Sequence, residues 1–178
     1  MRTGRLRFFG LATVVALSAA LLVATPSSSV STTTPASGGT YIPVTPSRVV
    51  GTVTGLGGAA QPLGADETRI YNVIGVGGVP ASDVSAVVLD VAPFNLSGAQ
   101  TSELRLWRAG ESSPAASVVT AANGLETSNT VIVEPSESGH VAVHNSEGNV
   151  DINIDVQGYF TAETDDGAAF IPIASTQI

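Results

Sequence analysis

The chain has 178 residues, of which 43% are hydrophobic and 12% are charged, so its length predicts one domain. All seven basic residues are arginines, and three of them lie in the first seven positions, which leaves four arginines against fifteen carboxylates in the rest of the chain. A body this acidic lacks the basic surface that nucleic-acid binding requires, and it repels anionic membranes and wall polymers. The chain contains no cysteine, which excludes disulfides, thiolate metal sites and cysteine nucleophiles.

The first 24 residues have the pattern of a secretory signal peptide. A basic start is followed by 17 residues without a charge, Phe8–Ala24. We expect cleavage after Ala24; the alternative is an uncleaved anchor, because an apolar run of this length can span a bilayer. Both alternatives place the body outside the cytoplasm, so we predict a secreted protein.

Residues 25–40 are rich in Ser, Thr, Pro and Gly and carry no charge. This composition buries too little apolar surface to offset the entropy of ordering, and it predicts a flexible linker. The alternative is a peptide that becomes ordered on a partner.

The body of the chain, residues 41–162, reads as a series of short strands. Runs rich in Val and Ile alternate with turn residues, and no apolar series has the helical spacing. In Glu103–Arg108 the two leucines alternate with charged residues, and Asp151–Val156 alternates in the same way. The nine expected strands are Tyr41–Val44, Arg48–Val53, Thr68–Ile74, Val84–Val91, Glu103–Arg108, Ala116–Thr120, Thr130–Glu134, His140–His144 and Asp151–Phe160.

About nine strands at this spacing favour an all-β fold, an antiparallel β-sandwich of the jelly-roll or immunoglobulin-like kind. A parallel sheet is excluded because the chain has no room for crossover helices.

The C-terminal extension, residues 163–178, contains an echo of the start of the domain. Phe170-Ile171-Pro172-Ile173 repeats the aromatic-Ile-Pro-aliphatic pattern of Tyr41–Val44, 129 positions earlier. Self-similarity at a fixed offset indicates descent from a tandem array. Proline at the third position suits an edge strand, because it donates no hydrogen bond to a ladder.

Five segments, in this order, resemble a repeat domain of secreted actinobacterial proteins that is often appended to extracellular and cell-wall hydrolases such as peptidoglycan amidases. The segments are Tyr41–Arg48, Gly75–Ala81, Ser85–Val91, Val141–Ser146 and Asp155–Phe160. The resemblance implies an all-β, non-catalytic accessory module and supplies no catalytic residues to transfer. The family usually continues after the first segment with an aliphatic pair and Asp-Thr-Arg; here Gly51–Val53 stands in place of the last three, so the Asp and the second Arg are missing.

No arrangement of residues predicts a catalytic or metal centre. His140 and His144 lie on one face of a strand about 13 Å apart, too far to bind one ion together. Asp151-x-Asn153-x-Asp155 imitates the start of an EF-hand loop but lacks its glycine and glutamate. No G-x-S-x-G sequence occurs. We therefore predict no cofactor, although Asp90 could pair in space with one of the other aspartates, as glycoside hydrolysis requires.

The candidate contact residues form two groups. Trp107 shares the polar face of its strand with Glu103 and is flanked by Arg105 and Arg108, which makes it the residue to test for ligand stacking; the alternative is a tryptophan that covers a sheet rim. Phe170, Ile171 and Ile173 are candidates for adding a strand to the sheet of a partner.

We predict a secreted, non-enzymatic module that binds extracellular proteins and serves as an adaptor subunit of an extracellular or cell-envelope assembly, such as a toxin. It is predicted to bind neither nucleic acid nor, beyond the signal segment, membrane. The alternatives are a carbohydrate- or peptidoglycan-binding accessory module and a hydrolase.

Overall fold

The structure, a computed structural model, describes residues 39–161, and these residues form eight β-strands and no helix. The described residues thus include no helix long and apolar enough to cross a membrane. The signal peptide, most of the linker and the C-terminal extension lie outside the described residues. The strands are β1 (Tyr41–Gly51), β2 (Glu67–Asn72), β3 (Val84–Ser97), β4 (Thr101–Arg108), β5 (Val119–Ala122), β6 (Asn129–Val133), β7 (His140–Asn145) and β8 (Asn149–Thr161).

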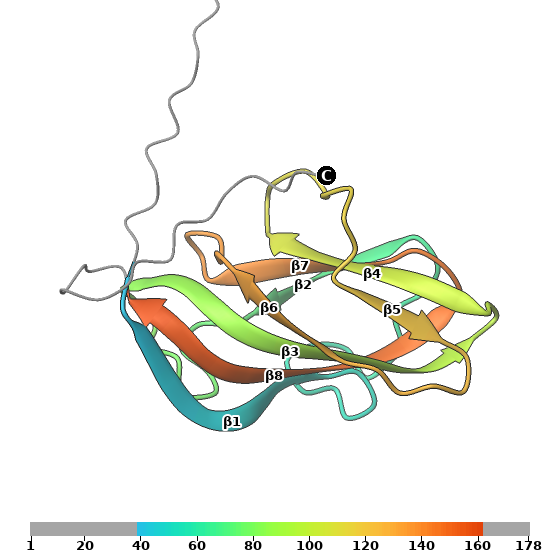
Figure 1. The fold of residues 1–178 in the computed structure, drawn as a ribbon, viewed down its shortest axis with the longest axis horizontal. Helices are drawn as coiled ribbons and strands as arrows, with labels where there is room; N and C mark the ends of the chain where they lie inside the picture. Colours follow the sequence, from blue (N-terminus) through green and yellow to red (C-terminus); the bar gives the residue numbers. More distant parts are fainter. Residues whose placement is uncertain (1–38, 162–178) are drawn as a thin grey trace, which may run out of the picture. The chain divides into compact units, whose positions relative to one another are not determined.

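The strands form two antiparallel sheets of four, in the orders β1-β8-β3-β6 and β2-β7-β4-β5. The two sheets lie in separate layers, with β1, β8 and β3 in one and β2, β7 and β4 in the other (Figure 1). The pairing is nested, because β4 pairs with β5, β3 with β6, β2 with β7 and β1 with β8. The chain therefore pairs like one long hairpin that has been folded across the two sheets.

Period-two alternation places the core between the sheets. In β8, Val150, Ile152, Ile154 and Val156 are fully buried, while the residues between them are only half-buried. In β4, Leu104 and Leu106 point inward, as their alternation with charged residues predicts. Because β3 is apolar on both faces, it suits its place inside a sheet, between β8 and β6.

The all-β class and the antiparallel sandwich are confirmed, but the expected nine strands are eight. The segments Tyr41–Val44 and Arg48–Val53 are parts of one strand, β1, whose pairing with β8 is interrupted between Pro43 and Ser47. A β-bulge absorbs the prolines there, because β1 is an edge strand and needs no donor on its free side. The strand expected over Ala116–Thr120 begins later, at Val119.

The turn between β2 and β3 explains one of the five segments of the resemblance in terms of backbone geometry. The amide of Gly75 donates to the carbonyl of Pro80 (3.1 Å), and Val79 inserts into the core. Gly77 has a positive φ of 60°, and a Cβ at this position would lie 2.7 Å from Cγ1 of Val49. The turn therefore needs glycine for both its conformation and its close approach to β1.

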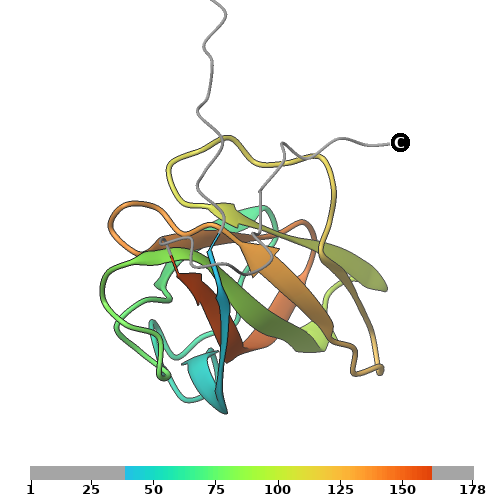
Figure 2. The ribbon, with the colours of Figure 1, turned by 60° about the vertical axis from the view of Figure 1, so that its left-hand side comes forward.

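On the other sheet, residues 109–118 connect β4 to β5. This connection extends beyond the strands on the side of β4, and both views show it standing out from the layers (Figures 1 and 2). The indole Nε1 of Trp107 donates to the carbonyl of Glu111 within this connection (3.0 Å), which fixes the start of the loop against the end of β4.

Candidate functional site

Trp107 lies on the outward face of the β2-β7-β4-β5 sheet. The strand registers place Ile70 of β2, Ala142 of β7 and Trp107 of β4 side by side in one row across the sheet. We call these three residues the Trp107 strip. Ile70 is 60% exposed, whereas Ala142 is only 3% exposed although it points outward. The two larger side chains therefore flank the alanine on the outward face, because register partners on neighbouring strands lie side by side.

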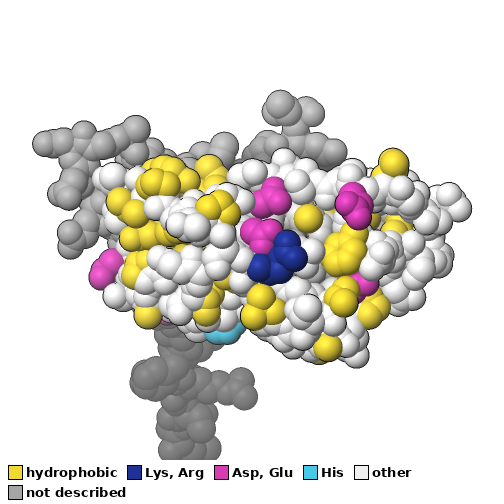
Figure 3. All heavy atoms as spheres, turned by 90° about the horizontal axis from the view of Figure 1, so that it is seen from below, with side chains coloured by type: hydrophobic (Ala, Val, Ile, Leu, Met, Phe, Trp, Pro, Cys, Tyr) yellow, Lys and Arg dark blue, Asp and Glu magenta, His cyan; other side chains and the backbone are white. Residues whose placement is uncertain are grey.

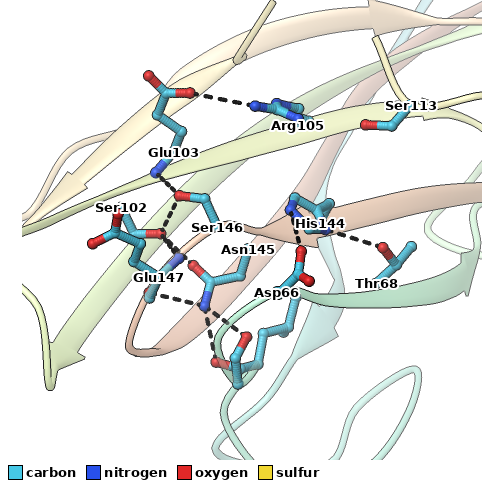
Figure 4. Close-up of polar contacts among 12 residues, drawn as sticks. Asp66, Thr68, Ser102, Glu103, Arg105, Ser113, His144, Asn145, Ser146 and Glu147 are labelled. Carbon is cyan, nitrogen blue, oxygen red and sulfur yellow. Dashed lines mark hydrogen bonds and ion pairs between the residues drawn. The ribbon is translucent and has the colours of Figure 1, made fainter. Parts of the chain in front are cut away.

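A polar row lies directly beside the Trp107 strip. It consists of Thr68, His144 and Arg105, which are register neighbours (Figure 4). The Nδ1 atom of His144 shares a hydrogen bond with the hydroxyl of Thr68 (3.1 Å), and its Nε2 lies 3.7 Å from the carboxylate of Asp66. Arg105 pairs with Glu103 at 3.7 Å. These contacts hold the row in place. In the neighbouring strip the one polar side-chain atom, Nε1 of Trp107, is satisfied by the carbonyl of Glu111.

Arg108 does not share the outward face with Trp107 and Arg105. It ends β4 and forms ion pairs with Glu134 and with Glu111. Arg108 lines a recess of about 320 Å³ together with Asp83, Glu134, Ser136 and Glu137. Three carboxylates and one guanidinium therefore line the recess, so it is acidic, and the guanidinium is already paired with Glu134.

The structure brings together two of the three aspartates that could act as a carboxylate pair. Asp90 and Asp155 are direct register partners on the outer face of the β1-β8-β3-β6 sheet. Asp155 receives two hydrogen bonds from Arg48, at 2.9 and 3.1 Å, and this contact raises the pKa of the guanidinium. Asp151 does not join them, because it accepts hydrogen bonds from Thr52 (2.7 Å) and Asn95 (3.1 Å).

Two observations bear on metal binding and histidine chemistry. Among residues 39–161, no three His, Asp or Glu side chains are grouped so that they could hold a metal ion. His140 and His144 both face outward on β7, separated by Ala142, and His140 shares a hydrogen bond with the hydroxyl of Ser138 (3.1 Å). The two histidines therefore belong to different local networks.

Asn145 is a buried polar centre that sequence reasoning did not single out. Its side chain is fully buried, and its Nδ2 lies 2.9–3.3 Å from four carbonyl oxygens. Its Oδ1 accepts a hydrogen bond from Ser102 (2.6 Å), whose hydroxyl also accepts from the amide of Glu147 (Figure 4). The amide thus ties the β7–β8 turn to β4 and to the segment before β2. Its place at the end of an alternating strand, directly before Ser146 and three residues before Gly148, was the only available signal.

A second polar centre closes the flank beside β2. The Arg69 guanidinium donates to both carboxylate oxygens of Glu67 (2.5 and 3.1 Å) and to the carbonyls of Gln61 (2.7 Å) and Pro62 (2.6 Å). The hydrogen bond from Arg69 lowers the pKa of Glu67. Burial raises the pKa of the neighbouring Tyr71 hydroxyl. These hydrogen bonds hold the β1–β2 connection against β2, so the role of this centre is structural.

A second apolar surface lies on the outer face of the other sheet. Figure 3 shows apolar side chains gathered at one end of this face and a charged group near its middle. Tyr41 is 43% exposed and Ile132 is 44% exposed. The registers align Pro43, Gly158, Val88 and Ile132 across the four strands, and Tyr41 lies opposite Phe160. We call these residues the Tyr41 patch.

Glycine at position 158 makes this patch possible. A Cβ at Gly158 would lie 2.5–2.7 Å from the ring and hydroxyl of Tyr41, so the ring can lie over β8 only because the side chain is absent. The Tyr41 ring also packs against Phe160, with centroids 5.3 Å apart. Two further segments of the resemblance therefore have a packing explanation.

Phe170, Ile171 and Ile173 lie outside the described residues. No family model matches the chain, and no curated protein matches it.

Proposed function

We propose that the protein is a secreted, non-enzymatic module that binds another extracellular protein through the Trp107 strip. The observation that carries the proposal is the row of Ile70, Ala142 and Trp107, an apolar surface on a face that an isolated sandwich would cover with polar residues. Tryptophan is enriched among the residues that dominate binding energy at protein interfaces. The polar row beside the strip supplies the kind of rim that surrounds such contacts.

The charge distribution supports a partner recognised by apolar contact. Each of the four arginines among residues 39–161 has a carboxylate partner, namely Asp155, Glu67, Glu103 or Glu134. No guanidinium in this part of the chain is therefore left over for a phosphate or a polyanion. A protein partner with an apolar contact surface and a neutral or basic rim fits this surface better than an anionic polymer does.

The pairing order supports a jelly roll as the finer description of the sandwich. The nested pairs β1–β8, β2–β7, β3–β6 and β4–β5 are those of a long hairpin rolled into two four-stranded sheets. Together with the predicted signal peptide and the resemblance to an accessory module of secreted proteins, this favours an adaptor in an extracellular or cell-envelope assembly, with toxins among the assemblies to examine.

Carbohydrate or peptidoglycan binding is the second candidate, because Trp107 could stack on a sugar ring. Its neighbour in the row is an aliphatic side chain, Ile70, rather than a second ring. The aliphatic neighbour favours the protein partner. Replacing Ile70 also distinguishes the two functions in an experiment.

The test uses quantitative pull-down from the culture medium of the source organism, followed by affinity measurement with the recovered protein. Trp107→Ala and Ile70→Ala are each expected to weaken binding, by about 30-fold for the tryptophan. Thr101→Ala is the matched control, because Thr101 is exposed on the same strand but outside the strip. Unchanged affinity for the recovered protein in both strip variants would refute the proposal.

Binding to purified peptidoglycan and polysaccharides is measured with the same proteins. Binding that Trp107→Ala abolishes and Ile70→Ala leaves intact would identify the carbohydrate function instead. A hydrolase screen with Asp90→Asn and Asp155→Asn covers the remaining alternative, since turnover that either change abolishes would show that the protein is an enzyme.

A further inference from the structure

Three of the four edge strands carry features that prevent them from pairing with another strand. In β1, Pro43 and Pro46 flank a break in register. In β2, Glu67 and Arg69 are charged residues on the inward face. Prolines, bulges and inward charges are the common means by which natural edges avoid pairing.

The edge strand β5 is protected by its own connection to β6. It has only four residues, and Leu125 forms a bridge with Ala122. The hydroxyl of Thr127 donates to the carbonyl of Thr120 (3.1 Å). The chain after β5 thus folds back along its free side.

The fourth edge, β6, has none of these features. Its sequence, Asn129–Val133, contains no charge and no proline, and its register with β3 is continuous. Within residues 39–161 the backbone of β6 forms hydrogen bonds only with β3, and the one further hydrogen bond of the strand runs from the side chain of Asn129 to the carbonyl of Val118 (2.7 Å). An uncharged, β-branched edge of this kind is a template for strand addition.

The open edge continues the Tyr41 patch. Ile132 is the outward-facing apolar residue of β6, and the patch reaches the edge of the sheet there. Val131 and Val133 point toward the core side of the same edge. A strand added to β6 would therefore find an apolar neighbour on each of its two faces.

We propose that the segment Phe170–Ile173 of the same chain adds to β6 as a fifth, antiparallel strand of the β1-β8-β3-β6 sheet. The length of the chain permits this pairing. Tyr159 of β8 and Val133 of β6 both pair with Val87, so the end of β8 lies two strands, about 10 Å, from the end of β6. The eight residues between Thr161 and Phe170 can span up to about 26 Å.

The direction and the pattern of side chains also agree. Because β8 and β6 both run toward this end of the sheet, a chain that turns back after β8 runs antiparallel to β6. The segment repeats the aromatic-Ile-Pro-aliphatic pattern of Tyr41–Val44, which forms the opposite edge of this same sheet with Tyr41 and Pro43 facing outward. In the same orientation Phe170 and Pro172 extend the Tyr41 patch, and Pro172 leaves a new edge that cannot be extended further.

The same chain is preferred over a second copy because of effective concentration. A tether of eight residues holds the segment at a local concentration in the millimolar range, well above ordinary concentrations of a second molecule. The proposed strand does not involve the Trp107 strip, so this proposal can be tested independently of the proposed binding function.

The absence of cysteine allows a direct test in the full mature chain. Ala174 has the outward parity of Phe170 and Pro172, so Ala174→Cys is combined with Ile132→Cys or with Thr130→Cys, because Thr130 and Ile132 face outward on β6. The control combines Ala174→Cys with Thr68→Cys, which is exposed on the other sheet. Oxidised samples are analysed by non-reducing electrophoresis and peptide mass spectrometry at several protein concentrations.

The expected result is a disulfide within one chain in a β6 variant, with a yield independent of protein concentration and well above that of the control. Cross-links that form only between chains would replace this proposal with strand addition to a second copy. Yields equal to the control in both β6 variants would overturn it.

Hydrogen exchange gives a readout that needs no cysteine. The change Ile171→Asp in the full mature chain is expected to speed exchange of the β6 amides that face the free edge by about tenfold or more, because their partners are lost. Amides of β7 serve as the internal control, since β7 lies inside the other sheet. Equal exchange at β6 in both proteins would refute the pairing.

Discussion

Replacing Asn145 with alanine should strongly destabilise the domain. The amide is fully buried, and it connects Ser102 to the backbone of the β7–β8 turn and of the segment before β2. Alanine removes every one of these links at once and leaves carbonyl oxygens that water cannot easily reach.

The size of the effect follows from the number of hydrogen bonds that the amide can satisfy. Its two hydrogens are shared among four carbonyls and its oxygen accepts one hydroxyl, which amounts to about three full hydrogen bonds. At roughly 1 kcal/mol each, with a further contribution from the unpaired carbonyls, the free energy of unfolding should fall by about 3–4 kcal/mol. For a domain of this size the midpoint of thermal unfolding should fall by roughly 10–20 °C.

Chemical and thermal denaturation followed by circular dichroism measure this change. Asn149→Ala is the matched control, because Asn149 is exposed and its side chain forms no hydrogen bond within residues 39–161; it should change stability by less than about 0.5 kcal/mol. Asn145→Asp tests the direction in which stability changes with pH. Burial beside four carbonyls would raise the pKa of the new carboxyl in the folded state, so this variant should lose stability as pH rises above about 4. A loss below about 1 kcal/mol in Asn145→Ala would refute the assigned role.

The remaining predictions concern the flank beside β2 and the Tyr41 patch. The hydrogen bond from Arg69 lowers the pKa of Glu67. The ionised Glu67 therefore stabilises the fold at pH values above the pKa of an unfolded-state glutamate, about 4.3, and this stabilisation is lost as the pH falls below that value. Denaturation measured from about pH 3 to 7 should therefore show a weaker acid dependence in Glu67→Gln than in the wild type, and identical slopes would contradict the pairing. Gly158→Ala should cost about 1–2 kcal/mol, because its Cβ would lie 2.5–2.7 Å from the Tyr41 side chain. The cost should largely disappear in a Tyr41→Ala background, and a cost that is equal in both backgrounds in a double-mutant cycle would count against this contact.

The sequence located most strands but not their limits. Alternation in β4 and β8 was enough to predict both the strands and their buried faces, because a period of two puts every second residue into the core. The predicted split of β1 into two strands failed at Pro43 and Pro46. Prolines are strong local breakers, and only the position of β1 at a sheet edge allows one strand to continue through them.

The candidate site was predicted in part. The parity of Trp107 with Glu103 placed it on the outward face, but no pattern within β4 could reveal that Ile70 and Ala142 share its row. The same limit applied to Arg108, whose carboxylate partner Glu134 lies 26 residues away. Contacts between strands depend on register, and register is set by turns and pairings that local alternation does not encode.

Local physical chemistry in the sequence determined the acidic character, the lack of cysteine chemistry, the β-class and the inward faces of the strands, because each depends on composition or on neighbours along the chain. Only the tertiary structure decided which residues meet across sheets: the Trp107 strip, the buried amide of Asn145, and the single unprotected edge at β6 among the edges described. These features arise from pairings between segments far apart in the chain, such as β1 with β8, where Tyr41 pairs with Phe160, and the free energy of such contacts exists only once the chain has closed.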